Sequence, residues 1–272
     1  MNYVEVTIKA DLQLQEILIA ELENVDFESF EQNDENLKAF IKTDLFDDVR
    51  LNFIINKYNL NYSKSIIKEQ NWNELWESNF QPVIVGDFVA VRASFHEPIV
   101  NIVHEIIITP KMSFGTGHHA TTFMMMELMK QIDFKGKQVA DFGTGTGVLA
   151  ILAEKLGAAK VWATDNDDWC IDNASENFKN NFSQNIDIQK VNSFYSNKKF
   201  DIILANINKN IILENFQSLS NSLLPNGILL LSGLLIADEA DILSKVVTLK
   251  LNHKLTREKN GWLAIWLYKT VG

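Results

Sequence analysis

Cysteine, long apolar runs and clusters of basic residues are nearly absent from this sequence of 272 residues. Cys170 is the only cysteine, which excludes a disulfide framework and a thiolate metal site. A membrane-spanning helix needs about 20 consecutive apolar residues, whereas the longest apolar run, 228–237, is interrupted by Ser232 and Gly233. The first residues alternate with charges and lack the apolar segment of a secretory signal. We therefore expect a cytoplasmic protein with no metal and no membrane association.

Basic residues are outnumbered by acidic ones. The 25 Lys and Arg against 35 Asp and Glu give a formal net charge of −10, and no run of Lys or Arg forms a basic stripe. We therefore expect no direct binding to nucleic acid. An acidic surface suits a basic partner, and it equally serves solubility. The apolar fraction of 46% is ordinary for a globular protein, and the length allows two modest domains.

Residues 1–68 are predicted to form a small α+β domain. Apolar alternation and helical periodicity predict strands at 3–9, 27–31, 37–42 and 63–68 and helices at 14–22 and 45–58. This order of strands and helices is that of a ferredoxin-like unit. Residues 69–109 are predicted to connect it to the rest of the chain. They contain a helix over 71–80, with Trp72 and Trp76 on one face, and three short strands at 83–85, 88–92 and 105–109.

A glycine-rich turn between a strand and a helix organises residues 139–157. Gly143, Gly145 and Gly147 follow a short apolar strand and precede a helix with one apolar face. Glycines at such a turn let a ligand approach the backbone, and the N-terminus of the helix favours an anionic group on that ligand. The spacing Asp141-x-Gly-x-Gly-x-Gly resembles the first motif of the class I S-adenosylmethionine (SAM) methyltransferases.

An acid at the end of the next predicted strand agrees with this resemblance. Asp165 ends the strand 160–165, about 20 residues after Gly143, where an acid accepts hydrogen bonds from ribose hydroxyls. Nicotinamide-dependent dehydrogenases share this feature, but their fingerprint needs a small residue where this chain has Val148. A dehydrogenase is therefore the less favoured alternative. A glycine turn without ligand and a SAM-binding scaffold without activity also remain open.

Residues 110–272 are predicted to form the catalytic domain, of α/β class. Strands and helices alternate, which predicts a Rossmann-like, mostly parallel sheet with helices on both faces. Asn260 and Gly261 form the strongest hairpin signal, between strands 251–257 and 262–268, and predict an antiparallel terminal strand. The remaining predicted elements are strands 186–191, 200–206 and 228–231 and helices 169–182 and 213–224, the latter stopped by Pro225.

A second glycine-containing loop, residues 110–122, precedes a predicted helix at 123–129. His118 and His119 are adjacent and point in different directions, with no carboxylate three or four residues away, so we do not expect them to bind a metal. Thr121 and Thr122 either cap the helix or belong to a loop that closes over a cofactor. Both interpretations remain open.

Three segments, Pro110–Thr122, Asp141–Leu149 and Ala205–Ile207, together resemble the PrmA family. Those enzymes use SAM to methylate large-subunit ribosomal protein eleven. The Phe-Gly-Thr-Gly-His-x-x-Thr-Thr pattern in the first segment is the specific part, because ordinary class I methyltransferases lack it. The resemblance covers the whole chain and implies SAM as cofactor and that ribosomal protein as substrate. It implies cofactor contacts at Thr122, Gly143, Asp165 and Asn206.

The resemblance further implies methyl transfer to lysine side-chain amines, N-terminal amines or both. It implies that residues 1–68 hold the substrate while the catalytic domain transfers the methyl group. Such a transfer depends mainly on positioning, and we expect Asn206 to orient the amine without acting as a base; no residue is a certain catalytic group. A SAM-dependent N-methyltransferase of another protein or of nucleic acid is the alternative. We expect a monomer.

Overall fold

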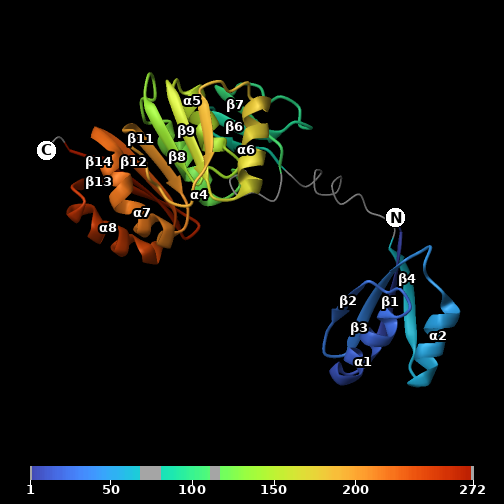
Figure 1. Ribbon diagram of the computed structural model, residues 1–272. Coiled ribbons are helices and arrows are strands. Elements are labelled where there is room, and N and C mark those ends of the chain that lie inside the picture. Colours follow the sequence, from blue (N-terminus) through green and yellow to red (C-terminus); the bar gives the residue numbers. More distant parts are fainter. Residues whose placement is uncertain (1, 68–80, 111–116, 271–272) are drawn as a thin grey trace. The chain divides into compact units, whose positions relative to one another are not determined.

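The computed structural model describes residues 2–67, 81–110 and 117–270 (Figure 1). The chain forms two compact units, residues 1–79 and 80–272, and the second includes the three short strands that were predicted as part of a connection. The domain boundaries at 68 and 109 stay predictions. The predicted helix with Trp72 and Trp76 lies outside the described residues. Each unit is described separately below.

The first unit has the predicted ferredoxin-like order. Its antiparallel sheet has the strand order β2-β3-β1-β4, and alternate residues of β1 and β3 are buried against the two helices. The second helix begins three residues later than predicted because the Asp47 carboxylate accepts hydrogen bonds from two N–H groups of its first turn. The elements are β1 Tyr3–Lys9, α1 Leu12–Glu23, β2 Ser29–Gln32, β3 Asn36–Lys42, α2 Asp48–Lys57 and β4 Tyr62–Ile67.

The second unit contains a small sheet of three strands and a large sheet of seven among its described residues. The small sheet consists of β5 Val83–Val85, β6 Val89–Ala93 and β7 His104–Ile108. The large sheet and its helices are α4 Ala120–Met129, β8 Gln138–Phe142, α5 Val148–Lys155, β9 Lys160–Asp165, α6 Asp168–Asn180, β10 Ile186–Lys190, β11 Phe200–Asn206, α7 Lys209–Ser222, β12 Leu223–Leu235, α8 Glu239–Thr248, β13 Leu251–Lys259 and β14 Trp262–Lys269.

The large sheet confirms the predicted mostly parallel architecture. Its order is β10-β9-β8-β11-β12-β14-β13, parallel from β10 to β12, with β14 antiparallel to both of its neighbours. One apolar core lies under α4, α5 and α6 and a second under α7 and α8, so helices cover both faces (Figure 1). Asn260 and Gly261 both have positive φ, of 53° and 81°, as a two-residue hairpin turn requires.

Several elements of the second unit differ from the sequence-based expectation. Pro225 does not stop α7, which already ends at Ser222, and the Pro-Asn-Gly segment lies within β12. There Asn226 has a φ of 61° and the pairing with β11 shifts register, so an irregularity inside a strand resembled a turn. Helix α4 begins at Ala120 instead of residue 123. Helix α8 was not predicted, although its buried Ile242 and Val246 have helical spacing.

Candidate cofactor and substrate site

The candidate site lies where the strand order of the large sheet reverses, between β8 and β11. The loops that follow β8, β9 and β11 meet there, at the carboxyl ends of parallel strands, which is where doubly wound sheets bind ligands. They surround a cavity of about 520 Å³, a size typical of small-molecule pockets. Its walls include Gly143, Gly145, Asp165, Cys170, Asn206, Ile207, Gly233, His119 and Trp262.

Gly143 begins the glycine turn that follows β8. Its φ of 76° is disfavoured for residues with a side chain. A Cβ at this position would also overlap the Cγ2 atom of Ile207, which follows β11. The N–H groups of Gly143 and Thr144 donate to the carbonyl of Thr164 at 2.9 and 2.8 Å, which ties the turn to β9. Glycine is therefore required both by the backbone and by the neighbouring strand.

Asp165 is the last residue of β9 and is 9% exposed at the wall of the cavity. Its carboxylate accepts hydrogen bonds from the N–H groups of Gly145 at 2.9 Å, Asn166 at 2.8 Å and Asp167 at 3.2 Å. Since a carboxylate has about four acceptor positions, about one remains for a ligand. Asp165 thus stabilises the glycine turn and also offers an acceptor to a hydroxyl.

Asp141, in β8, stabilises the same turn through a hydrogen bond. It is 1% exposed, and its Oδ2 atom accepts a hydrogen bond of 2.6 Å from the Thr144 hydroxyl. Burial raises the pKa of the Asp141 carboxyl to about 7, and the charge of Asp165 acts in the same direction, while the Thr144 hydrogen bond opposes them. Asp141 therefore holds the first turn of the loop and is easily protonated near neutral pH.

Asn206 ends β11 and presents an unusual buried acceptor. Its Nδ2 group donates to the Thr122 hydroxyl of α4 at 3.1 Å, while its Oδ1 atom is buried and has no hydrogen-bond partner among the described residues. A buried acceptor without a partner is costly, so a ligand N–H in the cavity would stabilise it. Thr122 is 1% exposed and lies behind Asn206.

His119 and Trp262 form another part of the wall. Their rings meet edge to face, with centroids 4.6 Å apart and planes at 73°. His119 is also the N-cap of α4, because its side chain accepts a hydrogen bond from the Thr121 N–H. The capping role considered for Thr121 and Thr122 therefore belongs to His119. No group of three or more potential metal ligands occurs among the residues that the structure describes.

Gly233 lies within β12 and lets Ile207, which follows β11, approach its backbone closely. Its φ is 83°, and a Cβ there would overlap the carbonyl oxygen of Ile207. The pairing of β12 with β14 shifts register at this point. A glycine inside an apolar strand pattern indicates such a close approach, so the sequence contained a signal for Gly233. No sequence signal indicated that Trp262 or Cys170 lines the cavity. Asn208 is the N-cap of α7.

The residues around the cavity suit SAM, which carries a ribose diol, a sulfonium and an amino-acid group. Asp165 offers a carboxylate to hydroxyls, and Asn206 has a buried oxygen with no described partner. Gly143 and Gly233 let the chain after β11 approach closely at Ile207, which lies at the wall of the same cavity. The strand order, with its antiparallel β14, is that of the class I methyltransferase sheet. Fold and site together define a class I SAM-dependent methyltransferase.

Comparison with known proteins gives the particular family. The family described as Ribosomal protein L11 methyltransferase (PrmA) matches residues 2–270. The chain is 42% identical over 260 residues to the ribosomal protein L11 methyltransferase of Porphyromonas gingivalis, covering 92% of this chain and 89% of that protein. It is 36% identical over 276 residues to that of Phocaeicola vulgatus, covering 97% and 98%. This chain belongs to the PrmA family.

A solved structure supports the same assignment. The crystal structure of ribosomal protein L11 methylase from Lactobacillus delbrueckii subsp. bulgaricus is similar with a TM-score of 0.66 and 28% identity, covering 71% of this chain and 100% of that one. The resemblance predicted from the sequence is thus confirmed, SAM is the cofactor, and a dehydrogenase is not favoured.

Of the predicted site residues, the structure brings Gly143, Asp165 and Asn206 to one cavity and Thr122 behind Asn206. Their contacts with SAM stay predictions. Residues 111–116 of the second glycine-containing loop, for which closure over a cofactor was one of the open interpretations, lie outside the described residues. None of the helices in the described part of the chain has the length and apolar character needed to cross a membrane.

Proposed function

We propose that this protein transfers methyl groups from SAM to lysine side-chain amines, N-terminal amines or both on ribosomal protein L11. The relatives that carry this name cover nearly the whole chain, which supports the same substrate here. A ribosomal protein substrate suits action in the cytoplasm. We expect the chain to act as a monomer and to contact the protein, with no direct contact to nucleic acid.

The buried Oδ1 atom of Asn206 carries the mechanistic part of the proposal. A free lysine with a pKa near 10.4 is neutral in only about one molecule in 2,500 at pH 7, so forming the neutral amine costs roughly 4.6 kcal/mol of free energy. Entry into the cavity lowers the pKa of the amine, because burial disfavours the ammonium. Asn206 then accepts one N–H of the neutral amine, which directs its lone pair. An amide is not a base, so Asn206 positions the nucleophile and the proton leaves to water.

The cofactor would be held at the same cavity by the end of β9 and by the glycine turn that follows β8. Bound SAM supplies a methyl group on a sulfonium, which is already a good leaving group. Asp165 is suited to accept a hydrogen bond from a ribose hydroxyl, and Gly143 lies at the wall of the same cavity. The Thr122 hydroxyl accepts the hydrogen bond of the Asn206 amide nitrogen, so that the amide oxygen is left to accept from a ligand N–H. Residues 1–68 have a separate core and are assigned to substrate binding.

Methylation of purified ribosomal protein L11 tests the function directly. The full chain is incubated with isotope-labelled SAM and L11, and the modified amines are identified by mass spectrometry. We expect transfer by the wild-type chain, and a loss in kcat of about 10–100-fold in Asn206→Ala with SAM affinity changed much less, because a hydrogen bond to the reacting amine is removed. An unlabelled L11 would contradict the substrate. A wild-type kcat in Asn206→Ala would contradict the role of the amide.

A further inference from the structure

The outer face of α2 exposes two apolar side chains that do not belong to the core of the first unit. Val49 is 78% exposed and Phe53 is 77% exposed. They are four residues apart and therefore lie side by side on the helix surface. The buried residues of α2, Leu51, Ile54 and Ile55, face the opposite way, into the core. Leaving a Phe and a Val in water forgoes the free energy that their burial would provide.

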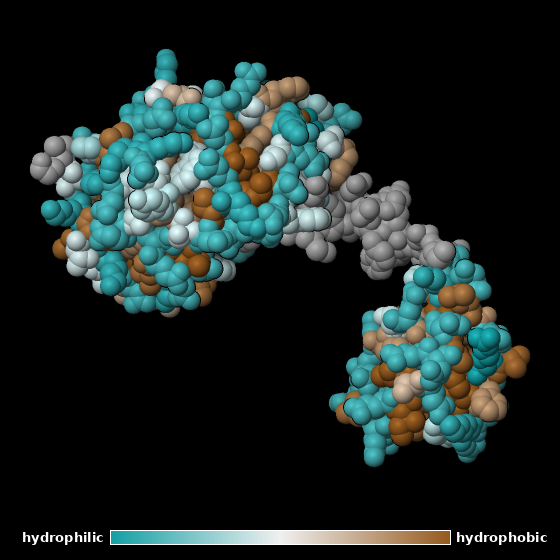
Figure 2. Space-filling view, in the orientation of Figure 1, coloured by the Kyte–Doolittle hydropathy of each residue, from teal (hydrophilic) through white to brown (hydrophobic). Residues whose placement is uncertain are grey.

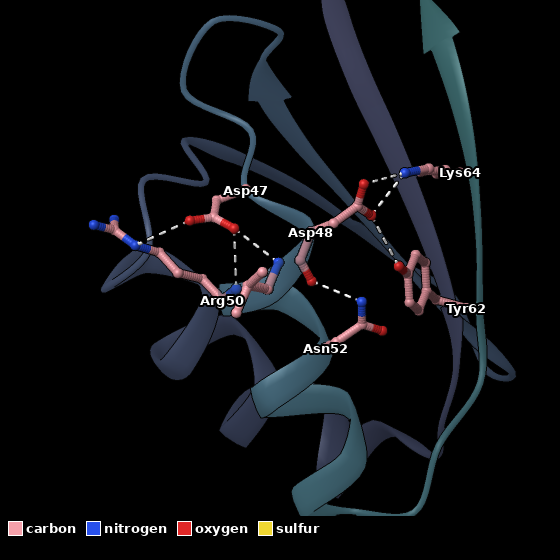
Figure 3. Close-up of polar contacts among 7 residues, drawn as sticks. Asp47, Asp48, Arg50, Asn52, Tyr62 and Lys64 are labelled. Atoms are coloured by element: carbon pink, nitrogen blue, oxygen red, sulfur yellow. Dashed lines mark hydrogen bonds and ion pairs between the residues drawn. The ribbon is translucent and has the colours of Figure 1, made fainter.

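One ion pair and two hydrogen bonds border this apolar stripe on the side of β4. The Asp48 carboxylate contacts the Lys64 ammonium at 2.6 Å and accepts a hydrogen bond of 3.2 Å from the Tyr62 hydroxyl (Figure 3). The Asn52 amide, one helical turn further on, donates to the backbone carbonyl of Asp48 at 2.7 Å. This border is polar and is ordered by contacts within the unit.

Further ion pairs border the stripe on the side of α1. Arg50 lies 3.7 Å from Asp47 (Figure 3) and 3.4 Å from Asp26, and Lys57 contacts Glu21 at 2.5 Å. The stripe of Val49 and Phe53 is therefore an apolar centre between two charged borders. Figure 2 shows such mixed character on the first unit, with apolar surface set among polar residues.

The first unit has a large excess of acidic over basic residues. Residues 2–67 contain 13 Asp and Glu and 6 Lys and Arg, a net charge of −7 within the −10 of the whole chain. Five of the six cations already form ion pairs with acids of the same unit. The field around the unit is therefore negative, so it attracts a basic protein and repels the phosphates of RNA.

We propose that the outer face of α2, centred on Val49 and Phe53, is the docking surface for a basic region of the protein substrate. The inference rests on the proposed function and adds where the substrate is held. An apolar centre with an aromatic side chain and a charged border is the usual anatomy of a protein interface. The excess of acidic residues selects a basic occupant.

Kinetics with ribosomal protein L11 and the full chain test this surface. Phe53→Ser is expected to raise KM for L11 by about ten-fold with kcat and SAM affinity unchanged, because an exposed aromatic residue at the centre of an interface is removed. KM should also rise with ionic strength, since attraction between opposite charges is screened. Val247→Ser is the matched control: Val247 is 81% exposed on α8 of the other unit, and its variant should keep the wild-type KM.

Binding of L11, measured by calorimetry, separates failure of the docking surface from failure of the function. Weaker binding to Phe53→Ser than to the wild type and to Val247→Ser supports the surface, whether or not methyl groups are transferred. Equal binding and equal KM in Phe53→Ser overturn the surface and leave the function standing. Absence of both L11 binding and L11 methylation in the wild type overturns both. Since Phe53 is exposed, unchanged thermal unfolding of the variant should accompany every result.

Discussion

Replacing Gly143 by alanine tests whether the glycine turn and the end of β11 are in direct contact. The φ of Gly143 is 76°, and a left-handed backbone costs a residue with a side chain about 1–2 kcal/mol. The new Cβ would also overlap the Cγ2 atom of Ile207, and excess volume in a packed site costs about 1–3 kcal/mol. Gly143→Ala should therefore lower the free energy of unfolding by roughly 2–5 kcal/mol.

Gly136→Ala separates the two contributions. Gly136 has a similar φ of 73°, but no heavy atom lies within 4 Å of its added Cβ, so only the backbone cost of about 1–2 kcal/mol applies. Ile207→Ala removes the Cγ2 atom that Gly143→Ala would meet. In the double variant of Gly143 and Ile207, the collision should disappear, giving a coupling energy of about 1–3 kcal/mol in a double-mutant cycle.

Urea unfolding followed by tryptophan fluorescence is a suitable assay, because four of the six tryptophans lie in residues 80–272. Calorimetric titration with SAM adds a second readout. Because Ile207 lines the cavity, Gly143→Ala should also weaken SAM binding, whereas Gly136→Ala should not. Equal losses of stability in Gly143→Ala and Gly136→Ala, together with additive effects in the cycle, would refute the proposed contact.

Two further predictions concern the acids below and beside the glycine turn. Asp165→Ala should weaken SAM binding by about 10–100-fold in calorimetric titration, because a charged acceptor is lost; unchanged affinity would remove Asp165 from the site. Burial raises the folded-state pKa of Asp141 from 3.8 to about 7, so the unfolded chain releases this proton at lower pH than the folded one. The contribution of Asp141 to stability therefore falls as pH rises from about 4 to 7, by up to roughly 4 kcal/mol. Asp141→Asn keeps an acceptor for the Thr144 hydroxyl without a charge, so its stability relative to wild type should increase across this range in urea unfolding of cofactor-free protein. Parallel stability curves for the two proteins would contradict this reasoning.

The local parts of the site could be predicted because their signals lie close together in the chain. The turn at Gly143 and the acid Asp165 occupy one strand–helix–strand unit, where spacing alone predicts that they are neighbours. Asn260 and Gly261 likewise predicted the terminal hairpin, since few other residue pairs adopt two positive φ angles. The alternation of strands and helices along the sequence was sufficient to predict the mostly parallel sheet.

The tertiary structure alone decided what surrounds these elements. Asn206 and Thr122 are 84 positions apart, and their hydrogen bond exists because β11 and α4 pack together. The approach of Ile207 to Gly143 and Gly233 and the contact of His119 with Trp262 likewise join distant segments. Sequence periodicity reports which face of an element is buried, but not which residue of another element it meets. The partners of the Asn206 amide and the walls of the cavity therefore followed only from the packing of the sheet and its helices.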